Sequence, residues 1–127
     1  MPDSDQIRAV YDRYPDLFCK GDLDGLVALY TEDATIEDPI GSEIHVGHDA
    51  IRAFYAPSAG SVTLKRTGPV CVAGNEAATL LAIIMGEGAD RKVLDIVSTM
   101  KFAEDGRVEA MRAYWSFDAL RPATDAD

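Results

Sequence analysis

The stretch Asp33-Ala34-Thr35-Ile36-Glu37-Asp38-Pro39 is the part of this sequence from which the fold is inferred. Its side chains alternate in character from Ala34 to Asp38, which predicts a short β-strand. Pro39 ends the strand, because proline cannot donate a hydrogen bond to a sheet ladder. Alternation puts Ile36 and Asp38 on one face, and the apolar Ile36 marks that face as the inner one. We therefore expect Asp38 to point inward.

Two helices are predicted before this strand. In the first, apolar residues recur at helical spacing, at positions 7, 10, 11, 14, 17 and 18, and Asp3 with Gln6 makes a capping box at its start. Pro15 lies inside this helix, where it removes a hydrogen bond and is expected to bend the axis. Gly21 ends the helix, and Asp22 caps a second, short one. The apolar side of the second helix is expected to consist of Leu26, Val27, Leu29 and Tyr30.

The rest of the chain predicts one more helix and then strands only. The helix covers about residues 48–56 and buries Ile51, Phe54 and Tyr55. The strands are expected at about 61–67, 70–73, 76–86, 91–102 and 107–116, between turn-rich stretches. This order indicates an α+β domain, in which helices pack over one face of a curved sheet and leave a pocket. The run from Thr79 to Met85 is apolar without alternation, so this strand should be covered on both faces, by the helices and by a second subunit.

Length and composition favour a single domain over residues 1–127. The chain has 47% apolar residues, and its 127 residues suffice for one core but not for two. Its 22 acidic and 12 basic residues give a net charge of −10, which would repel nucleic acid and anionic membranes. The sequence shows neither a signal-peptide pattern nor an apolar run long enough to span a bilayer. We therefore expect a cytoplasmic protein whose partner is a neutral small molecule.

Two polar side chains on the inner face are candidates for chemistry. A carboxylate such as Asp38 on an apolar face must be paired, solvated or used, and the structural alternative is that it caps the turn before Pro39. Ser98 is a hydroxyl within an apolar strand face, where it either bonds a local carbonyl or donates into the pocket. The other residues of that face are Leu94, Ile96, Met100 and Phe102, and the last strand could add Met111, Ala113 and Trp115 to the same cavity.

Three tyrosines are candidates for a hydrogen-bonded cluster. Tyr14, Tyr30 and Tyr55 are each assigned to the buried side of a different helix. A buried phenol needs a partner for its hydroxyl, and three converging phenols could satisfy one another. Such a chain would also make its last hydroxyl a better donor to a developing oxyanion. Taken singly, each tyrosine could equally be an ordinary core residue.

Together these residues resemble bacterial steroid Δ-isomerases, the ketosteroid isomerases of the NTF2-like, or SnoaL-like, superfamily. The similarity runs from about Ile7 to Phe117. Its most specific stretches are Arg13-Tyr14, Gly21-Asp22 through Leu29-Tyr30, Asp33 through Pro39 with Gly41, Phe54-Tyr55, Gly68-Pro69-Val70 and Ala113-Tyr114-Trp115-Ser116. The resemblance implies a conical α+β fold with a curved, mostly antiparallel sheet. It also implies three N-terminal helices over a deep apolar pocket, and a homodimer joined through the sheets.

The resemblance also assigns roles. Asp38 matches the general base and Tyr14 the principal oxyanion donor, while Tyr30 and Tyr55 match the phenols that support that donor. Ser98 stands where the best-studied members have a protonated aspartate, so we expect a weaker second donor. The residues expected to bind the substrate are Phe54, Trp115, Met100, Ile83 and Val70.

The function that follows is isomerisation of a β,γ-unsaturated (Δ5) 3-ketosteroid to its conjugated α,β-unsaturated (Δ4) isomer, with neither metal nor cofactor. His45 and His48 are three residues apart, but they straddle Gly47 and are better explained as surface histidines than as metal ligands. Two alternatives stay open. One is a cyclase, dehydratase or epoxide hydrolase of the same fold, and the other is a non-catalytic binding dimer.

Overall fold

The computed structural model describes residues 2–127, and Met1, the first residue of the predicted domain, lies outside the described residues. Three helices precede most of the sheet: α1 (Ser4–Lys20), α2 (Leu23–Ala28) and α3 (His48–Tyr55). Helix α1 begins at the predicted capping box and ends at Gly21, which has a φ of 70° and so adopts the left-handed conformation that glycine favours. Asp22 caps α2 by accepting from the Gly25 N–H. The predicted helices are thereby confirmed.

Pro15 lies inside α1, as predicted, and the helix continues to Lys20. One local expectation about the helices is wrong. Tyr30 is not part of α2, because that helix ends at Ala28 and Tyr30 begins the first strand. The physical reason is pairing: the Val108 N–H donates to the Leu29 carbonyl, so sheet hydrogen bonding already starts here, and tyrosine is a strong strand former.

The strands form one curved, mixed sheet. They are β1 (Tyr30–Glu37), β2 (Ile44–Val46), β3 (Thr63–Arg66), β4 (Cys71–Ala73), β5 (Glu76–Met85), β6 (Lys92–Phe102), β7 (Val108–Tyr114) and β8 (Arg121–Pro122). The main path is β2-β1-β7-β6-β5-β3, with β4 on β5 and β8 on β6. Every pair is antiparallel except β1 with β7. The short strands β2 and β8 and the 3-10 turns η1 (Gly88–Asp90) and η2 (Phe117–Ala119) were not predicted.

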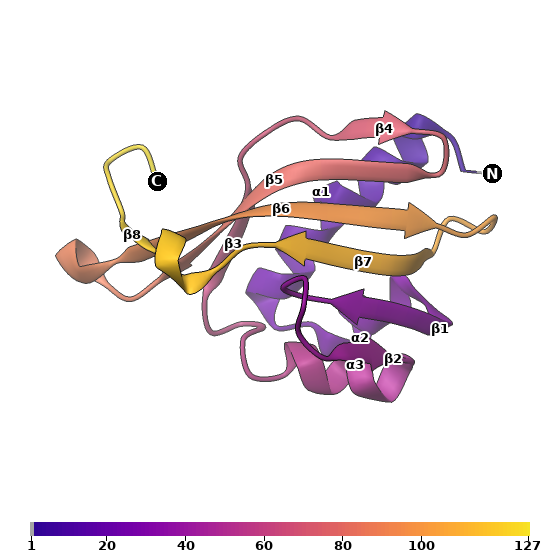
Figure 1. The fold of residues 1–127 in the computed structure, drawn as a ribbon, viewed down its shortest axis with the longest axis horizontal. Coiled ribbons are helices and arrows are strands. Elements are labelled where there is room, and N and C mark those ends of the chain that lie inside the picture. The colour runs from indigo at the N-terminus through magenta and orange to yellow at the C-terminus, as the bar shows by residue number, and fades with distance from the viewer. Residues whose placement is uncertain (1) are drawn as a thin grey trace.

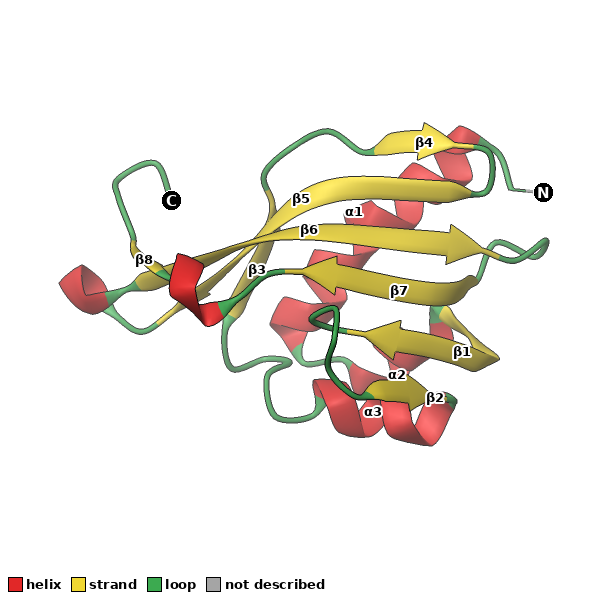
Figure 2. Cartoon of the chain, in the orientation of Figure 1, coloured by secondary structure: helices red, strands yellow, loops and turns green. Residues whose placement is uncertain are grey.

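The helices cover one face of this sheet (Figure 1). Helix α1 crosses the middle strands, while α2 and α3 lie beside β1 and β2. Figure 2 shows the β5–β6 hairpin extending past the end of β7, with the C-terminal residues near its tip. The chain therefore has the predicted α+β architecture, an NTF2-like fold in which a curved sheet is covered on one side.

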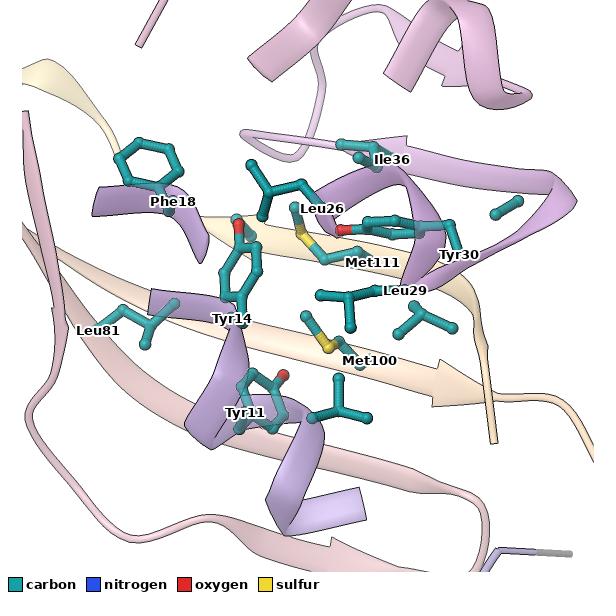
Figure 3. Packing of buried hydrophobic residues seen from close by; sticks show 14 of the residues in the cluster. Tyr11, Tyr14, Phe18, Leu26, Leu29, Tyr30, Ile36, Leu81, Met100 and Met111 are labelled. Atoms are coloured by element: carbon teal, nitrogen blue, oxygen red, sulfur yellow. The ribbon is translucent and has the colours of Figure 1, made fainter. Parts of the chain in front are cut away.

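The two faces of the sheet differ in burial. On the helix side, Tyr11, Tyr14 and Phe18 of α1 pack with Met100 and Met111 of the sheet (Figure 3). On the opposite side, Leu80, Val97 and Tyr114 are exposed by 40% or more. The prediction that β5 is covered on both faces is therefore not met within one chain.

No helix in residues 2–127 is both long and apolar enough to cross a membrane.

Candidate active site

A cavity of about 270 Å³ opens between the helices and the inner face of the sheet. Most of its lining is apolar, as expected for a site that takes a nonpolar small molecule. The lining residues that carry a hydroxyl or carboxyl group are Tyr14, Asp38, Tyr55, Ser58 and Ser98. Three of these, Tyr14, Asp38 and Ser98, come from distant parts of the chain: α1, the end of β1 and the middle of β6.

Asp38 reaches the cavity because it follows the last residue of β1. The Asp38-Pro39 peptide bond is cis, and Ile40 N–H donates to the Ala113 carbonyl, which ties the following loop to β7. The Trp115 indole Nε1–H donates to Asp38 Oδ1 at 2.5 Å. This bond holds Oδ1 in place, and the other carboxylate oxygen, Oδ2, takes no part in it.

The Asp38 carboxyl is mostly buried, and burial raises its pKa above the ordinary value. The Trp115 hydrogen bond and the nearby His45 act in the opposite direction and lower that pKa. A carboxylate with a raised pKa is a stronger base, provided that it stays ionised at the working pH. The indole N–H stabilises the negative charge of the carboxylate, so it favours the ionised form of Asp38.

A chain of three phenols ends at the cavity. Tyr30 and Tyr55 hydroxyls are 2.6 Å apart, and the Tyr55 hydroxyl donates to the Tyr14 oxygen at 3.0 Å. Tyr55 has one hydrogen and uses it on Tyr14, so Tyr30 must be the donor in the first pair. The chain therefore runs from Tyr30 through Tyr55 to Tyr14 and leaves the Tyr14 hydrogen free to point into the cavity.

Burial keeps this chain neutral. It raises the pKa of Tyr14, and the negative charge of Asp38 raises that pKa further. Burial is also the main reason that the pKa values of Tyr30 and Tyr55 are raised. All three phenols thus stay protonated, as donors to a developing oxyanion must.

Ser98 lies on the inner face of β6, is 1% exposed, and lines the cavity. Its neighbour is Tyr11, whose hydroxyl lies 3.2 Å from both the Ser98 oxygen atoms, Oγ and the carbonyl O. Position 11 was predicted only as part of the apolar stripe of the first helix. The signal that could have found it was present, because a buried phenol needs a hydrogen-bond partner and Tyr11 lies one helical turn before Tyr14.

Three of the five residues expected to bind substrate line the cavity: Phe54, Ile83 and Trp115. The other two assignments are corrected. Met100 is two residues beyond Ser98 on the same face of β6, but there the space is filled by core side chains such as Leu29 and Tyr11 (Figure 3). Val70 precedes β4, which pairs with the first half of β5.

The cavity is bounded instead by the second half of β5. The predicted inner faces of β6 and β7 contribute Leu94, Ile96, Met111 and Ala113 to the lining. The lining residues that were not predicted are Phe18, Ser58, Val62, Leu64, Leu81, Met85 and Phe117.

The two histidines have separate surroundings. The His45 ring packs against Phe54 with ring centres 5.0 Å apart, and His48 Nε2 lies 2.9 Å from the Tyr30 carbonyl oxygen. Among the described residues, no three or more His, Cys, Asp or Glu side chains are grouped so that they could hold a metal ion.

Comparison with known proteins extends this picture. The SnoaL-like domain family matches residues 11–111. A steroid Delta-isomerase of Nocardioides simplex is 32% identical over 113 residues, which is 89% of this chain and 92% of that protein. The epoxide hydrolase LasB of Streptomyces lasalocidi is 27% identical over 117 residues, 84% of this chain but 42% of that longer protein.

A solved structure is also similar. SalBIII, described as an epoxide hydrolase/cyclase-like enzyme in pyran ring formation in the polyether salinomycin, superposes with a TM-score of 0.86. It is 26% identical, and the match covers 97% of this chain and all of SalBIII.

Fold and cavity define an NTF2-like protein with a carboxylate and buried hydroxyl donors around an apolar pocket. With the matches above, the chain belongs to the SnoaL-like family, in the group that includes the ketosteroid isomerases. Its relatives are enzymes, and it is an enzyme of that family.

Proposed function

We propose that this enzyme is a steroid Δ-isomerase that moves the double bond of a β,γ-unsaturated 3-ketosteroid into conjugation with the ketone. One observation carries the proposal: a carboxylate of raised pKa and a phenol that receives a hydrogen bond from another phenol line the same apolar cavity. These are the two groups that an enolisation needs, a base for the carbon acid and a donor for the oxygen. The 32% identity to a steroid Delta-isomerase supports the same reaction.

In the proposed reaction Asp38 removes a proton from the carbon between the ketone and the isolated double bond. The electron pair of that C–H bond moves toward the carbonyl oxygen and forms a dienolate, to which Tyr14 and Ser98 donate hydrogen bonds. Asp38 then returns the proton to the γ carbon, so that the dienolate collapses to the conjugated ketone and the carboxylate is regenerated. Trp115 stays on one oxygen of Asp38 throughout. Protons and electrons balance without a cofactor.

An absorbance assay tests this function. The substrate 5-androstene-3,17-dione gains a strong conjugated-enone band only when it is isomerised, so turnover is followed directly. Asp38→Asn should lose 10³-fold or more of kcat, near the upper part of the ~10²–10⁴-fold range of general acid–base catalysis, because an amide does not accept the proton. The matched control is Asp16→Asn, which removes a carboxylate from the exposed side of α1 and should leave kcat unchanged. Equal activity in Asp38→Asn and wild type would contradict the proposal.

The similarity to LasB and SalBIII favours a second candidate, opening of an epoxide. There Asp38 would deprotonate water or a substrate hydroxyl, and Tyr14 would donate to the epoxide oxygen as the C–O bond breaks. Limonene oxide and 5-androstene-3,17-dione, given separately to the same preparation, distinguish the two reactions. Diol formation without enone formation would select the epoxide hydrolase. Silence in both assays with retained binding of a phenolic steroid would favour a binding protein.

A homodimer is proposed for the outer face of the sheet. Leu80, Val97 and Tyr114 lie in register across β5, β6 and β7, and form an exposed row. Such a row on an otherwise acidic protein is the kind of surface that a second copy covers. Analytical sedimentation should show a dimer for wild type and a monomer for Val97→Glu. The control is Arg8→Glu, which changes an exposed residue of α1 and should stay dimeric. A wild-type monomer at high concentration would contradict it.

A further inference from the structure

Ser98 has a partner that the proposed reaction does not use. The Tyr11 hydroxyl lies 3.2 Å from Ser98 Oγ, and Tyr11 is fully buried and outside the cavity lining. Substrate in the cavity therefore meets Ser98 and not Tyr11. Any effect of Tyr11 on the reaction must pass through Ser98.

Counting hydrogens limits how this pair can work. Tyr11 has one hydroxyl hydrogen, and the Ser98 Oγ and carbonyl oxygen are both 3.2 Å away. If Tyr11 donates to the carbonyl, Ser98 Oγ receives nothing from it. If Tyr11 donates to Oγ, then Ser98 receives a hydrogen bond and still has its own hydrogen for the cavity. Only the second arrangement strengthens Ser98 as a donor, because a hydroxyl that accepts a hydrogen bond donates more strongly.

We propose that Tyr11 is a positioning residue: when an oxyanion occupies the cavity, Tyr11 donates to Ser98 Oγ and Ser98 donates to the oxyanion. This inference rests on the function proposed above, and adds a second supported donor beside the Tyr30–Tyr55–Tyr14 chain. A serine alone is a weak oxyanion donor. The bond from Tyr11 aims its hydroxyl and polarises it.

The surroundings of Tyr11 suit this role. Its ring comes from α1 one turn before Tyr14 (Figure 3). A single helix therefore places one phenol in the cavity lining and another within hydrogen-bond distance of Ser98. Burial raises the pKa of Tyr11, which keeps it a neutral donor. Within residues 2–127 no buried side-chain nitrogen or oxygen lacks a partner, so the Tyr11 hydroxyl is committed to this pair.

The test measures oxyanion stabilisation without turnover. The probe is 4-nitrophenol, whose phenolate absorbs at longer wavelength than its phenol, so the ionised fraction of the bound probe is read directly. Ser98→Ala should reduce the phenolate-to-phenol ratio about tenfold, below the ~10²–10³-fold of a strong oxyanion donor. Tyr11→Phe keeps the ring and should reduce the ratio about fivefold, the value of an ordinary hydrogen bond. The control is Thr63→Val, which removes an exposed hydroxyl from β3 outside the cavity lining and should change nothing.

The double variant decides whether Tyr11 acts through Ser98. Tyr11→Phe should have no further effect in the Ser98→Ala background, because the partner is already gone. An equal effect of Tyr11→Phe in both backgrounds, no effect in either, or no uptake of phenolate by wild type would each overturn the proposal. Thermal unfolding of every variant shows that it is folded.

The same experiment separates this inference from the isomerase function. If wild type fails to isomerise the ketone but the probe responds as expected, the Tyr11–Ser98 pair stands and the isomerase function falls. If wild type isomerises and Tyr11→Phe leaves both kcat and the probe unchanged, the pair falls alone.

Discussion

The polar groups at the inner end of the cavity differ from those at its rim in burial and in hydrogen-bond partners. At the inner end, Tyr14 and Ser98 are 5% and 1% exposed and depend on other hydroxyls for their hydrogen bonds. At the rim, Asp38 is only partly buried and bonds to Trp115, whose ring packs edge-on against Phe117, a residue 72% exposed. The donors are almost completely buried, whereas the carboxylate keeps part of its surface exposed.

This difference has one physical origin. Burial favours the neutral form of both a phenol and a carboxylic acid. For an oxyanion donor that is an advantage, since a phenol must keep its proton to give a hydrogen bond. For a base it is useful only up to the point where the carboxyl still ionises, and the indole N–H and His45 both lower the pKa of Asp38 against the effect of burial.

Tyr14→Phe tests the role of the inner end of the cavity most directly. If the inner end stabilises the oxyanion, kcat should fall by about 10²–10³-fold, the usual cost of losing one oxyanion donor. Enone absorbance measures the rate, and the binding of a saturated steroid, which forms no oxyanion, should change little. A loss of less than tenfold would mean that the phenol chain is mainly structural.

Variants of Tyr55 and Tyr30 test whether the hydrogen-bonded phenols behind Tyr14 contribute to catalysis. Tyr55→Phe should reduce kcat about tenfold, because Tyr14 then loses its incoming hydrogen bond within a buried site. Tyr30→Phe should cost less, since its hydroxyl is one bond further away. The rates, measured at saturating ketone, should rank Tyr14, Tyr55, Tyr30 in order of loss. A larger loss for Tyr30→Phe than for Tyr55→Phe would contradict the direction of the chain.

At the rim, Trp115→Phe should act through pH. Its indole N–H lowers the pKa of Asp38, so the variant should raise that pKa and move the acid limb of the kcat/KM profile to higher pH. The loss on that limb should be about tenfold, typical of a hydrogen bond to a charged group, and should shrink as pH rises. Phe117→Ala removes ring area at the same rim without a hydrogen bond and should leave the limb in place. An unmoved limb in Trp115→Phe would contradict the role of the indole.

The smallest expected effect concerns stability. Because folding raises the pKa of Asp38, ionising this carboxyl costs folding free energy, and that cost appears as pH rises through the folded-state pKa. Asp38→Asn should therefore unfold at a slightly higher temperature than wild type at neutral pH. The difference should vanish in acid, where Asp38 is already protonated. Thermal unfolding at several pH values measures it, and a variant less stable at neutral pH would show that the charge is well compensated.

Much of the fold could be predicted because it depends on local sequence patterns. The capping box of α1, the glycine at its end and the strand after Asp33 each depend on neighbours within a few residues, and each was found. The position of Tyr30 was missed because its strand starts through a bond between Leu29 and Val108, which are far apart in the sequence. Met100 was assigned to the pocket because alternation identifies a face but not how far along that face the cavity extends.

By itself, the sequence determined the order of the three helices and the longer strands, the inward direction of Asp38 and Ser98, and the similarity to a family of known chemistry. Tertiary structure alone decided which inward side chains meet. It joined Trp115 to Asp38 across 77 positions and Tyr11 to Ser98 across 87. The reason is that periodicity gives each residue a face, while a contact between residues far apart in the chain depends on how whole elements pack against one another.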